Sequence, residues 1–178
     1  MKNGPTPGEI EIRAVTESDA GTLWALRLHA LTQDPQAFGE SAGEHRQTSP
    51  AVYAERLRNG GADNFVIGAF AGSALVGMAG FFREQQEKRR HRGQVWGVFV
   101  MPEYRGRGVG RALLEHLLEK ALTLPKLNCI ALTVTASQST ARQLYLNLGF
   151  RPFGIEPRAL IVNGIAVDEE HMQLEINR

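Results

Sequence analysis

One stretch of the chain decides its fold: Val98-Phe99-Val100-Met101-Pro102-Glu103-Tyr104-Arg105-Gly106-Arg107-Gly108-Val109-Gly110-Arg111. An apolar strand runs into a turn with three alternating glycines, and the turn leads directly into a helix. Glycine has no Cβ, so successive glycines let the backbone approach an anion closely. The free N–H groups and the positive dipole end of the first helical turn attract an anion to the same place. The arginines at 105, 107 and 111 add mobile positive charge, so the stretch predicts a binding site for a phosphate or pyrophosphate.

Two well-known phosphate-binding motifs do not match this turn. A Walker A loop requires G-x-x-x-x-G-K-[ST], and no lysine follows these glycines. A Rossmann fingerprint requires G-x-G-x-x-G and an acidic residue about 20 positions later. Here the spacing is G-x-G-x-G, and no Asp or Glu lies between Glu119 and Glu156. The remaining alternative is a strand-to-helix corner without a ligand, which would need neither three glycines nor three arginines.

Apolar patterning on both sides of the turn predicts alternating helices and strands. The clearest helix covers residues 108–122, where apolar side chains recur along one face from Val109 to Ala121. Gly149 suits the left-handed position that follows a helix. Other helices are expected after the capping residues 16–19 as far as Asp34, over 50–57 and over 139–148. Strands are expected over 9–14, 64–70, 74–83, 94–100, 130–134, 158–162 and 165–176, with an Asn163-Gly164 hairpin turn between the last two.

Length and composition predict a single globular domain. A chain of 178 residues is long enough to bury about 70% of its unfolded surface. Hydrophobic residues make up 43% and charged residues 22%, which argues against wholesale disorder. Residues 1–8 are rich in Gly and Pro and predict a flexible N-terminal tail, so the domain is expected over residues 9–178.

Charge, cysteine content and hydropathy exclude several classes of protein. Twenty Lys+Arg against 19 Asp+Glu give a net charge of +1, so no global field points to nucleic acid or an anionic membrane. The basic run at 88–92 lacks interleaved aromatic residues and favours a solvated loop over a nucleic-acid contact. A single cysteine, Cys129, excludes a disulfide framework and a Cys-rich zinc site, and no metal is expected. No apolar stretch approaches ~20 residues and no signal peptide is recognised, which predicts a cytoplasmic protein without a membrane span.

Two motifs together resemble the GNAT superfamily of N-acetyltransferases, which bind acetyl-CoA. Arg105-x-x-Gly108-x-Gly110 matches the Arg/Gln-x-x-Gly-x-Gly/Ala signature of that family. Ala141-x-x-Leu144-Tyr145-x-x-x-Gly149-Phe150 is similar to its second conserved block. The expected order of strands and helices from Glu9 to Ile176 also looks like that fold, so the resemblance covers nearly the whole chain. Gln138 departs from the family pattern, because many members carry Asn there.

The resemblance implies a single α/β (α+β) domain with a central, mostly antiparallel mixed sheet flanked by helices. It implies that acetyl-CoA is the cosubstrate and that a primary amine attacks the thioester directly in a ternary complex. A catalytically silent acyl-CoA-binding module is the alternative function. The backbone of residues 98–100 would pair with pantetheine like an added strand, and a β-bulge or a splay from strand 130–134 would free its N–H groups. The expected cofactor-binding residues are Val98, Phe99, Val100, Arg105, Gly106, Arg107, Gly108, Val109, Gly110, Arg111 and Gln138.

Tyr145 matches the tyrosine that serves as general acid in many family members, so it is the expected catalytic residue that protonates the CoA sulfur. Core packing on a helix edge is its alternative role. The general base is not evident, and the candidates by polarity are Glu84, His91, Glu156, Glu170 and His171, or a water chain. Arg142 could reach a CoA phosphate. The expected partners are a small-molecule or peptide amine acceptor and, as a family-level expectation, a second copy of the chain.

Overall fold

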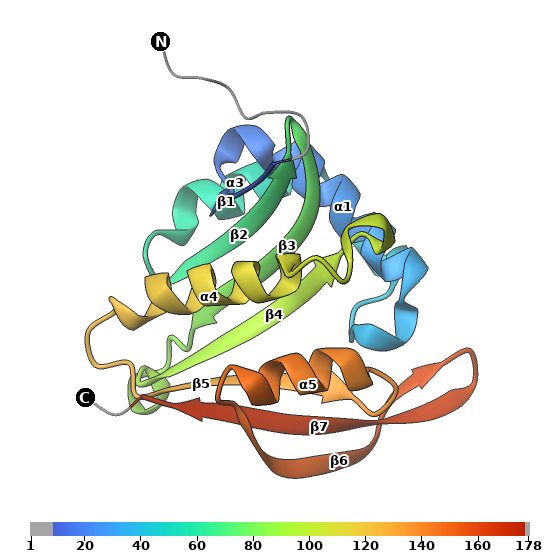
Figure 1. The fold of residues 1–178 in the computed structure, drawn as a ribbon, viewed down its shortest axis with the longest axis vertical. Helices are drawn as coiled ribbons and strands as arrows, with labels where there is room; N and C mark the ends of the chain where they lie inside the picture. The colour runs from blue at the N-terminus through green and yellow to red at the C-terminus, as the bar shows by residue number, and fades with distance from the viewer. Residues whose placement is uncertain (1–8, 177–178) are drawn as a thin grey trace.

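A seven-stranded mixed sheet forms the centre of the structure, a computed structural model that describes residues 9–176 (Figure 1). The tail predicted over residues 1–8 lies outside the described residues, as do residues 177–178. The strands follow the order β1-β2-β3-β4-β5-β7-β6, and only the β4–β5 pair is parallel. Their bounds are β1 Ile10–Ala14, β2 Asn64–Ala71, β3 Ala74–Arg83, β4 Arg92–Val100, β5 Cys129–Thr135, β6 Arg151–Val162 and β7 Ile165–Glu175.

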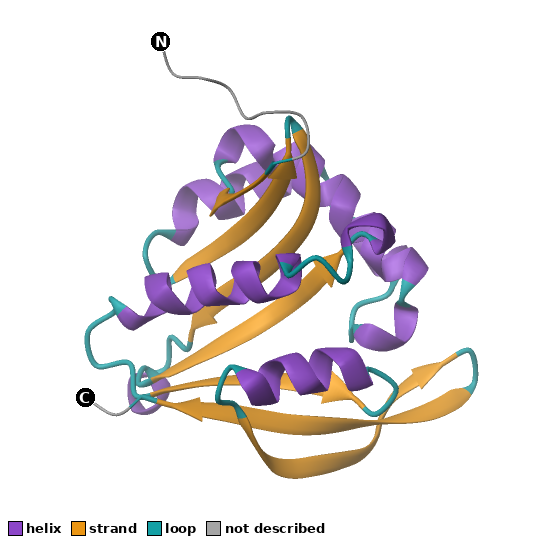
Figure 2. Cartoon of the chain, viewed as in Figure 1, coloured by secondary structure: helices purple, strands orange, loops and turns teal. Residues whose placement is uncertain are grey.

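Helices cover both faces of the sheet (Figure 2). In the view of Figure 1, α4 and α5 lie in front of the sheet, and α1 and α3 lie behind it. The α-helices are α1 Ala20–Gln33, α2 Ala42–His45, α3 Pro50–Gly60, α4 Val109–Leu122 and α5 Ser139–Asn147. Single 3-10 turns are η1 Glu17–Asp19, η2 Pro35–Ala37, η3 Glu87–Arg89 and η4 Pro102–Tyr104. The mixed α/β class expected from the sequence is confirmed.

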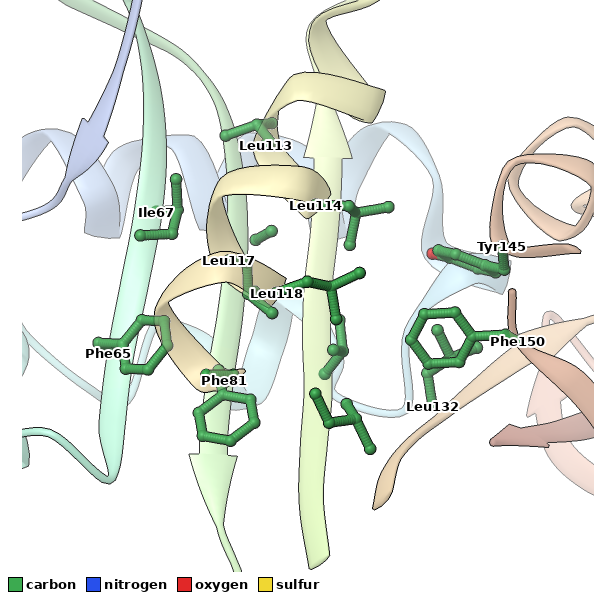
Figure 3. Close-up of a cluster of buried hydrophobic side chains, with 14 of the residues drawn as sticks. Phe65, Ile67, Phe81, Leu113, Leu114, Leu117, Leu118, Leu132, Tyr145 and Phe150 are labelled. Carbon is green, nitrogen blue, oxygen red and sulfur yellow. The ribbon is translucent and has the colours of Figure 1, made fainter. Parts of the chain in front are cut away.

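The core on the α4 side is the larger of two buried clusters (Figure 3). The apolar stripe predicted for α4 is buried against β2, β3 and β4, and Leu113, Leu114 and Leu117 have no exposed surface. The smaller cluster joins α1 and α3 to the opposite face of β2 and β3. The two cores fix α4 and α1 on opposite faces of β2 and β3.

Strand β6 corrects one sequence prediction, because it begins at Arg151 rather than at 158. The first part of this strand was not predicted because it contains Pro152, Gly154 and Pro157, and proline and glycine are depleted in strand interiors. The structure accommodates them at the sheet edge, where the register with β7 shifts between Pro152 and Gly154 and again between Glu156 and Leu160. Helix α2 and the 3-10 turns were also not predicted. The Asn163-Gly164 turn is confirmed, with both φ angles positive (51° and 80°).

Strands β4 and β5 pair only at one end. Arg92 to Gln94 lie opposite Cys129 to Ala131, and beyond them the two strands diverge. A bulge accompanies the divergence, because Met78 faces Phe99 and Gly80 faces Trp96, so that Gly97 and Val98 both lie opposite Ala79. Gly97 adopts a φ of +63°, which other residues rarely tolerate. The splay from β5 that the sequence suggested is therefore present, and the bulge lies in the pairing with β3 on the other side of β4.

Candidate functional site

The glycine-rich turn ends β4 and starts α4. Gly106 and Gly108 have left-handed φ angles of 72° and 78°, which explains why glycine occupies these positions. Within residues 9–176, no backbone N–H from Gly106 to Arg111 donates to a backbone carbonyl. The first bond of the helix runs from the N–H of Ala112 to the carbonyl oxygen of Gly108 (3.0 Å). A row of unused donors therefore points out of the turn at the positive end of the α4 dipole.

A cavity of about 430 Å³ opens beside this turn. Its wall comes from the end of β4, the glycine-rich turn, the start of α5 and the end of α1. Ten of the eleven cofactor-binding residues expected from the sequence line it, namely Val98, Phe99, Val100, Arg105, Gly106, Gly108, Val109, Gly110, Arg111 and Gln138. The remaining one, Arg107, does not line the cavity, and its guanidinium lies 5.7 Å from the ring centre of Tyr104.

Two arginines of the turn form ion pairs, although about half of each side chain is exposed. Arg105 donates through Nε to the carbonyl oxygen of Val100 (2.8 Å) and through Nη2 to Asp34 at the end of α1 (2.7 Å). Arg111 pairs with Glu115 one helical turn later (2.7 Å). Arg105 therefore ties the turn to β4 and to α1, a role that only the folded structure reveals because Asp34 is distant in the sequence.

A second cavity, of about 160 Å³, occupies the opening between β4 and β5. Val98 and Phe38 line both cavities, so the two spaces adjoin. Tyr145 of α5 lines the second cavity from one layer of the molecule, and Arg27 of α1 lines it from the other. The splayed strands thus connect the two faces of the sheet at this point.

Tyr145 is buried, with 6% of its surface exposed, and its ring packs edge-on against Phe150 at 6.1 Å (Figure 3). Burial raises the pKa of the Tyr145 hydroxyl well above its ordinary value near 10. The side chain is therefore a protonated donor at neutral pH. Tyr145 packs in the core, the alternative role considered from the sequence, and it also lines the cavity between β4 and β5.

None of the expected general bases lines either cavity. Glu84 pairs with Arg89, and His171 pairs with Glu156 (3.1 Å). Glu170 is held by the guanidinium of Arg142 at 2.7 and 3.2 Å. This ion pair also corrects the expectation that Arg142 is available to a phosphate.

Glu169 of β7 lines the second cavity instead. Burial raises the pKa of its carboxyl, partly offset by nearby His171. The sequence-based candidates for the general base included Glu170 but not Glu169. Strand alternation was the missed signal, because it puts Glu169 and Glu170 on opposite faces of the sheet.

Two further sequence features lie away from the cavities. The basic run at 88–92 extends from η3 to the first residue of β4. It therefore lies at the end of β4 that is opposite to the glycine-rich turn. Arg89 and Arg90 are paired there with Glu84 and Asp63. Cys129 is buried, and burial raises the pKa of its thiol, as expected for a packing residue. Among residues 9–176, no helix is long and apolar enough to cross a membrane.

Comparison with known proteins gives consistent matches. A model of the acetyltransferase (GNAT) family matches residues 26–150. The N-alpha-acetyltransferase RimI of Mycobacterium tuberculosis is 33% identical over 160 residues, which cover 87% of each chain. The spermine/spermidine N(1)-acetyltransferase of Bacillus subtilis is 32% identical over 80% of this chain and 88% of that protein. A further relative, an uncharacterized protein of Mycobacterium leprae, is 38% identical over 101 residues, but this chain spans only 27% of it.

Among solved structures, yncA of Salmonella typhimurium with its cofactor acetyl-CoA superimposes with a TM-score of 0.81. The match covers 96% of both chains at 21% sequence identity. At this identity the likeness establishes the fold.

Proposed function

This chain belongs to the acetyltransferase (GNAT) family, and from that membership we propose that it moves an acetyl group from acetyl-CoA to a primary amine by direct attack in a ternary complex. One observation carries the proposal. The cavity beside the unused N–H donors of the glycine-rich turn adjoins, at Val98, a second cavity that reaches both faces of the sheet. A cosubstrate and an acceptor can therefore meet from opposite sides without passing each other.

The residues present fit coenzyme A. The unused N–H groups from Gly106 to Arg111 suit a diphosphate, because the donors and the helix dipole point the same way. Beyond Gln94 the β5-facing edge of β4 is unpaired within the described residues, so residues 98–100 can receive the pantetheine amides as an added strand. Gln138, at the N-terminus of α5, completes the same wall and offers both a donor and an acceptor.

The backbone at Val98 or Phe99 supplies the proposed oxyanion donor. Charge develops on the thioester oxygen when the amine attacks, and a fixed N–H aimed at that oxygen stabilises it. Loss of one such donor costs about 3 kcal/mol in other enzymes. The Gly97 bulge immediately precedes this part of the strand, and both Gly97 and Val98 line the opening between β4 and β5.

Tyr145 is the proposed general acid. In water, proton transfer from a tyrosine (pKa ~10) to a thiolate (thiol pKa ~8.5) is uphill by about 2 kcal/mol. Burial raises the pKa of Tyr145 further, but the same cavity desolvates the departing thiolate and makes it a stronger base. The buried hydroxyl therefore keeps its proton until the thiolate forms.

Glu169 is the proposed general base. It lines the cavity of Tyr145, and its raised pKa makes it a better proton acceptor than a solvated glutamate. At pH 7, deprotonation of an amine with pKa ~10.4 costs about 4.6 kcal/mol, and only the neutral amine can attack. A carboxylate near the acceptor can accept this proton.

The names of two relatives indicate two kinds of amine, an α-amine for the N-alpha-acetyltransferase RimI and a polyamine for the Bacillus subtilis enzyme. A panel of both kinds, incubated with acetyl-CoA while free thiol is followed, tests the proposal. We expect amine-dependent thiol release in the wild type. Binding of CoA without turnover of any amine would favour the silent acyl-CoA-binding module. A cytoplasmic location and a homodimer remain predictions.

A further inference from the structure

Arg27 is a buried arginine with one unused hydrogen-bonding edge. It lies on α1, has 7% of its surface exposed and lines the cavity that contains Tyr145 and Glu169. Its Nε and Nη2 donate to Oε2 of Glu40 at 3.2 and 3.1 Å. Its Nη1 is buried as well, but it has no hydrogen-bond partner among residues 9–176.

The guanidinium is fixed in place by its surroundings. Its central carbon lies 4.6 Å from the ring centre of Phe38 and 5.8 Å from that of Trp96, so aromatic rings pack against it. Glu40, which holds the other edge, is itself within 3.4 Å of Nδ1 of buried His45. The orientation of the free edge is therefore set before any ligand arrives.

The free edge faces the bulge of β4. A Cβ built on Gly97 would lie 3.4 Å from Nη1 of Arg27, so the absence of a side chain at Gly97 leaves room beside this nitrogen. Val98, the next residue, is one of the two proposed oxyanion donors and lines both cavities. The unused nitrogen therefore lies beside the place where the amine would attack.

A charged donor that is buried without an acceptor is unfavourable, and a ligand oxygen would satisfy it. Given the proposed function, on which this step rests, we propose that Arg27 binds a carbonyl or carboxylate oxygen of the acceptor. The reactive amine is then an α-amine, as in an amino acid or the first residue of a peptide. In such an acceptor the amine and the carbonyl oxygen are close enough to fit together in one small cavity. A polyamine offers no acceptor oxygen and adds positive charge next to Arg27.

The test compares acceptors that differ in this oxygen. Thiol release gives kcat/KM for an alanine-initiated tripeptide, for alaninamide and for isopropylamine, which lacks the carbonyl, with spermidine as the polyamine. Values of kcat/KM are compared per unprotonated amine, because an α-amine (pKa ~8) is far less protonated at neutral pH than an alkylamine (pKa ~10.4). On that scale we expect the wild type to favour the oxygen-bearing acceptors by about 100-fold or more, as for other sites with a buried polar group. Equal kcat/KM for the tripeptide and for isopropylamine or spermidine would overturn the inference.

Substitution then separates acceptor recognition from other roles. Arg27→Met is expected to lower kcat/KM for the tripeptide about 10- to 100-fold more than for isopropylamine, because the charge-assisted hydrogen bond exists only with the tripeptide. Arg58→Met, which removes an exposed arginine of α3 paired with Glu17, is the control and should leave the preference unchanged. An equal loss for all acceptors would overturn the inference, since the contribution of Arg27 would then not depend on the acceptor oxygen.

Calorimetry on the CoA-loaded wild type needs no variant and no turnover. The tripeptide should bind at least 10-fold more tightly than isopropylamine, and equal binding would contradict the inference. If no amine is acetylated while the tripeptide still binds preferentially, the proposed function fails and the role of Arg27 stands. If Arg27→Met does not fold, Arg27→Lys serves instead, because it retains the charge without the planar guanidinium. The Lys variant should keep only part of the wild-type preference for the peptide.

Discussion

Replacing Tyr145 with phenylalanine removes one hydroxyl from the cavity between β4 and β5. The ring keeps its contact with Phe150, and no hydrogen bond of the hydroxyl to another described residue is lost, so Tm should change by no more than a few degrees. General acids contribute typically 10²- to 10⁴-fold to a rate. We therefore expect kcat to fall by this factor, equivalent to about 2.7 to 5.4 kcal/mol, while the Kd for CoA stays within a few-fold.

The assay is thiol release at saturating acceptor between pH 6 and 10. Because burial raises the pKa of Tyr145, the wild type keeps the proton on this hydroxyl throughout that range and shows no alkaline loss of kcat due to it. Tyr53→Phe is the comparison variant, because it removes the hydroxyl of another buried tyrosine, which contacts Nδ1 of His45 (3.4 Å) and lines a different cavity, between α3 and β2. Full kcat in Tyr145→Phe across this pH range would refute the acid role.

Two other substitutions test the base and the packing of β4. In the wild type, activity should fall as the pH drops through the pKa of Glu169, which lies above its usual range. Glu169→Gln should lower kcat at least 10-fold and remove this acidic limb of the pH profile. An acidic limb that persists in Glu169→Gln would rule out this base. Gly80→Ala places a Cβ 2.1 Å from the ring of Trp96, so we expect a loss of about 1–3 kcal/mol in the free energy of unfolding and altered tryptophan fluorescence. Wild-type stability in urea would contradict that packing.

The parts of the fold that depend on neighbours in sequence were predictable. The glycine-rich turn, α4 and the Asn163-Gly164 hairpin each rest on local patterns, and the structure contains all three. The cofactor-side residues were predictable for the same reason, because β4, the turn and α4 are consecutive in the chain.

The acceptor side was not predictable, because it is assembled from distant segments. Arg27 is one charged residue in an apolar helix, and nothing local indicates that Phe38 and Trp96 pack against it or that Glu40 takes only one of its edges. Glu169 becomes a candidate base only when β7 lies beside β5. Helix periodicity and strand alternation describe single elements, whereas this cavity depends on where β4 and β5 separate.

The central claim is that the backbone N–H groups from Gly106 to Arg111 receive the diphosphate of coenzyme A. Amide NMR of the ¹⁵N-labelled protein, titrated first with pantetheine and then with CoA, addresses it most directly. We predict that CoA shifts the amide signals of these six residues strongly, while pantetheine, which has no diphosphate, leaves them in place. Tight CoA binding that leaves all six amide signals unmoved would contradict the account.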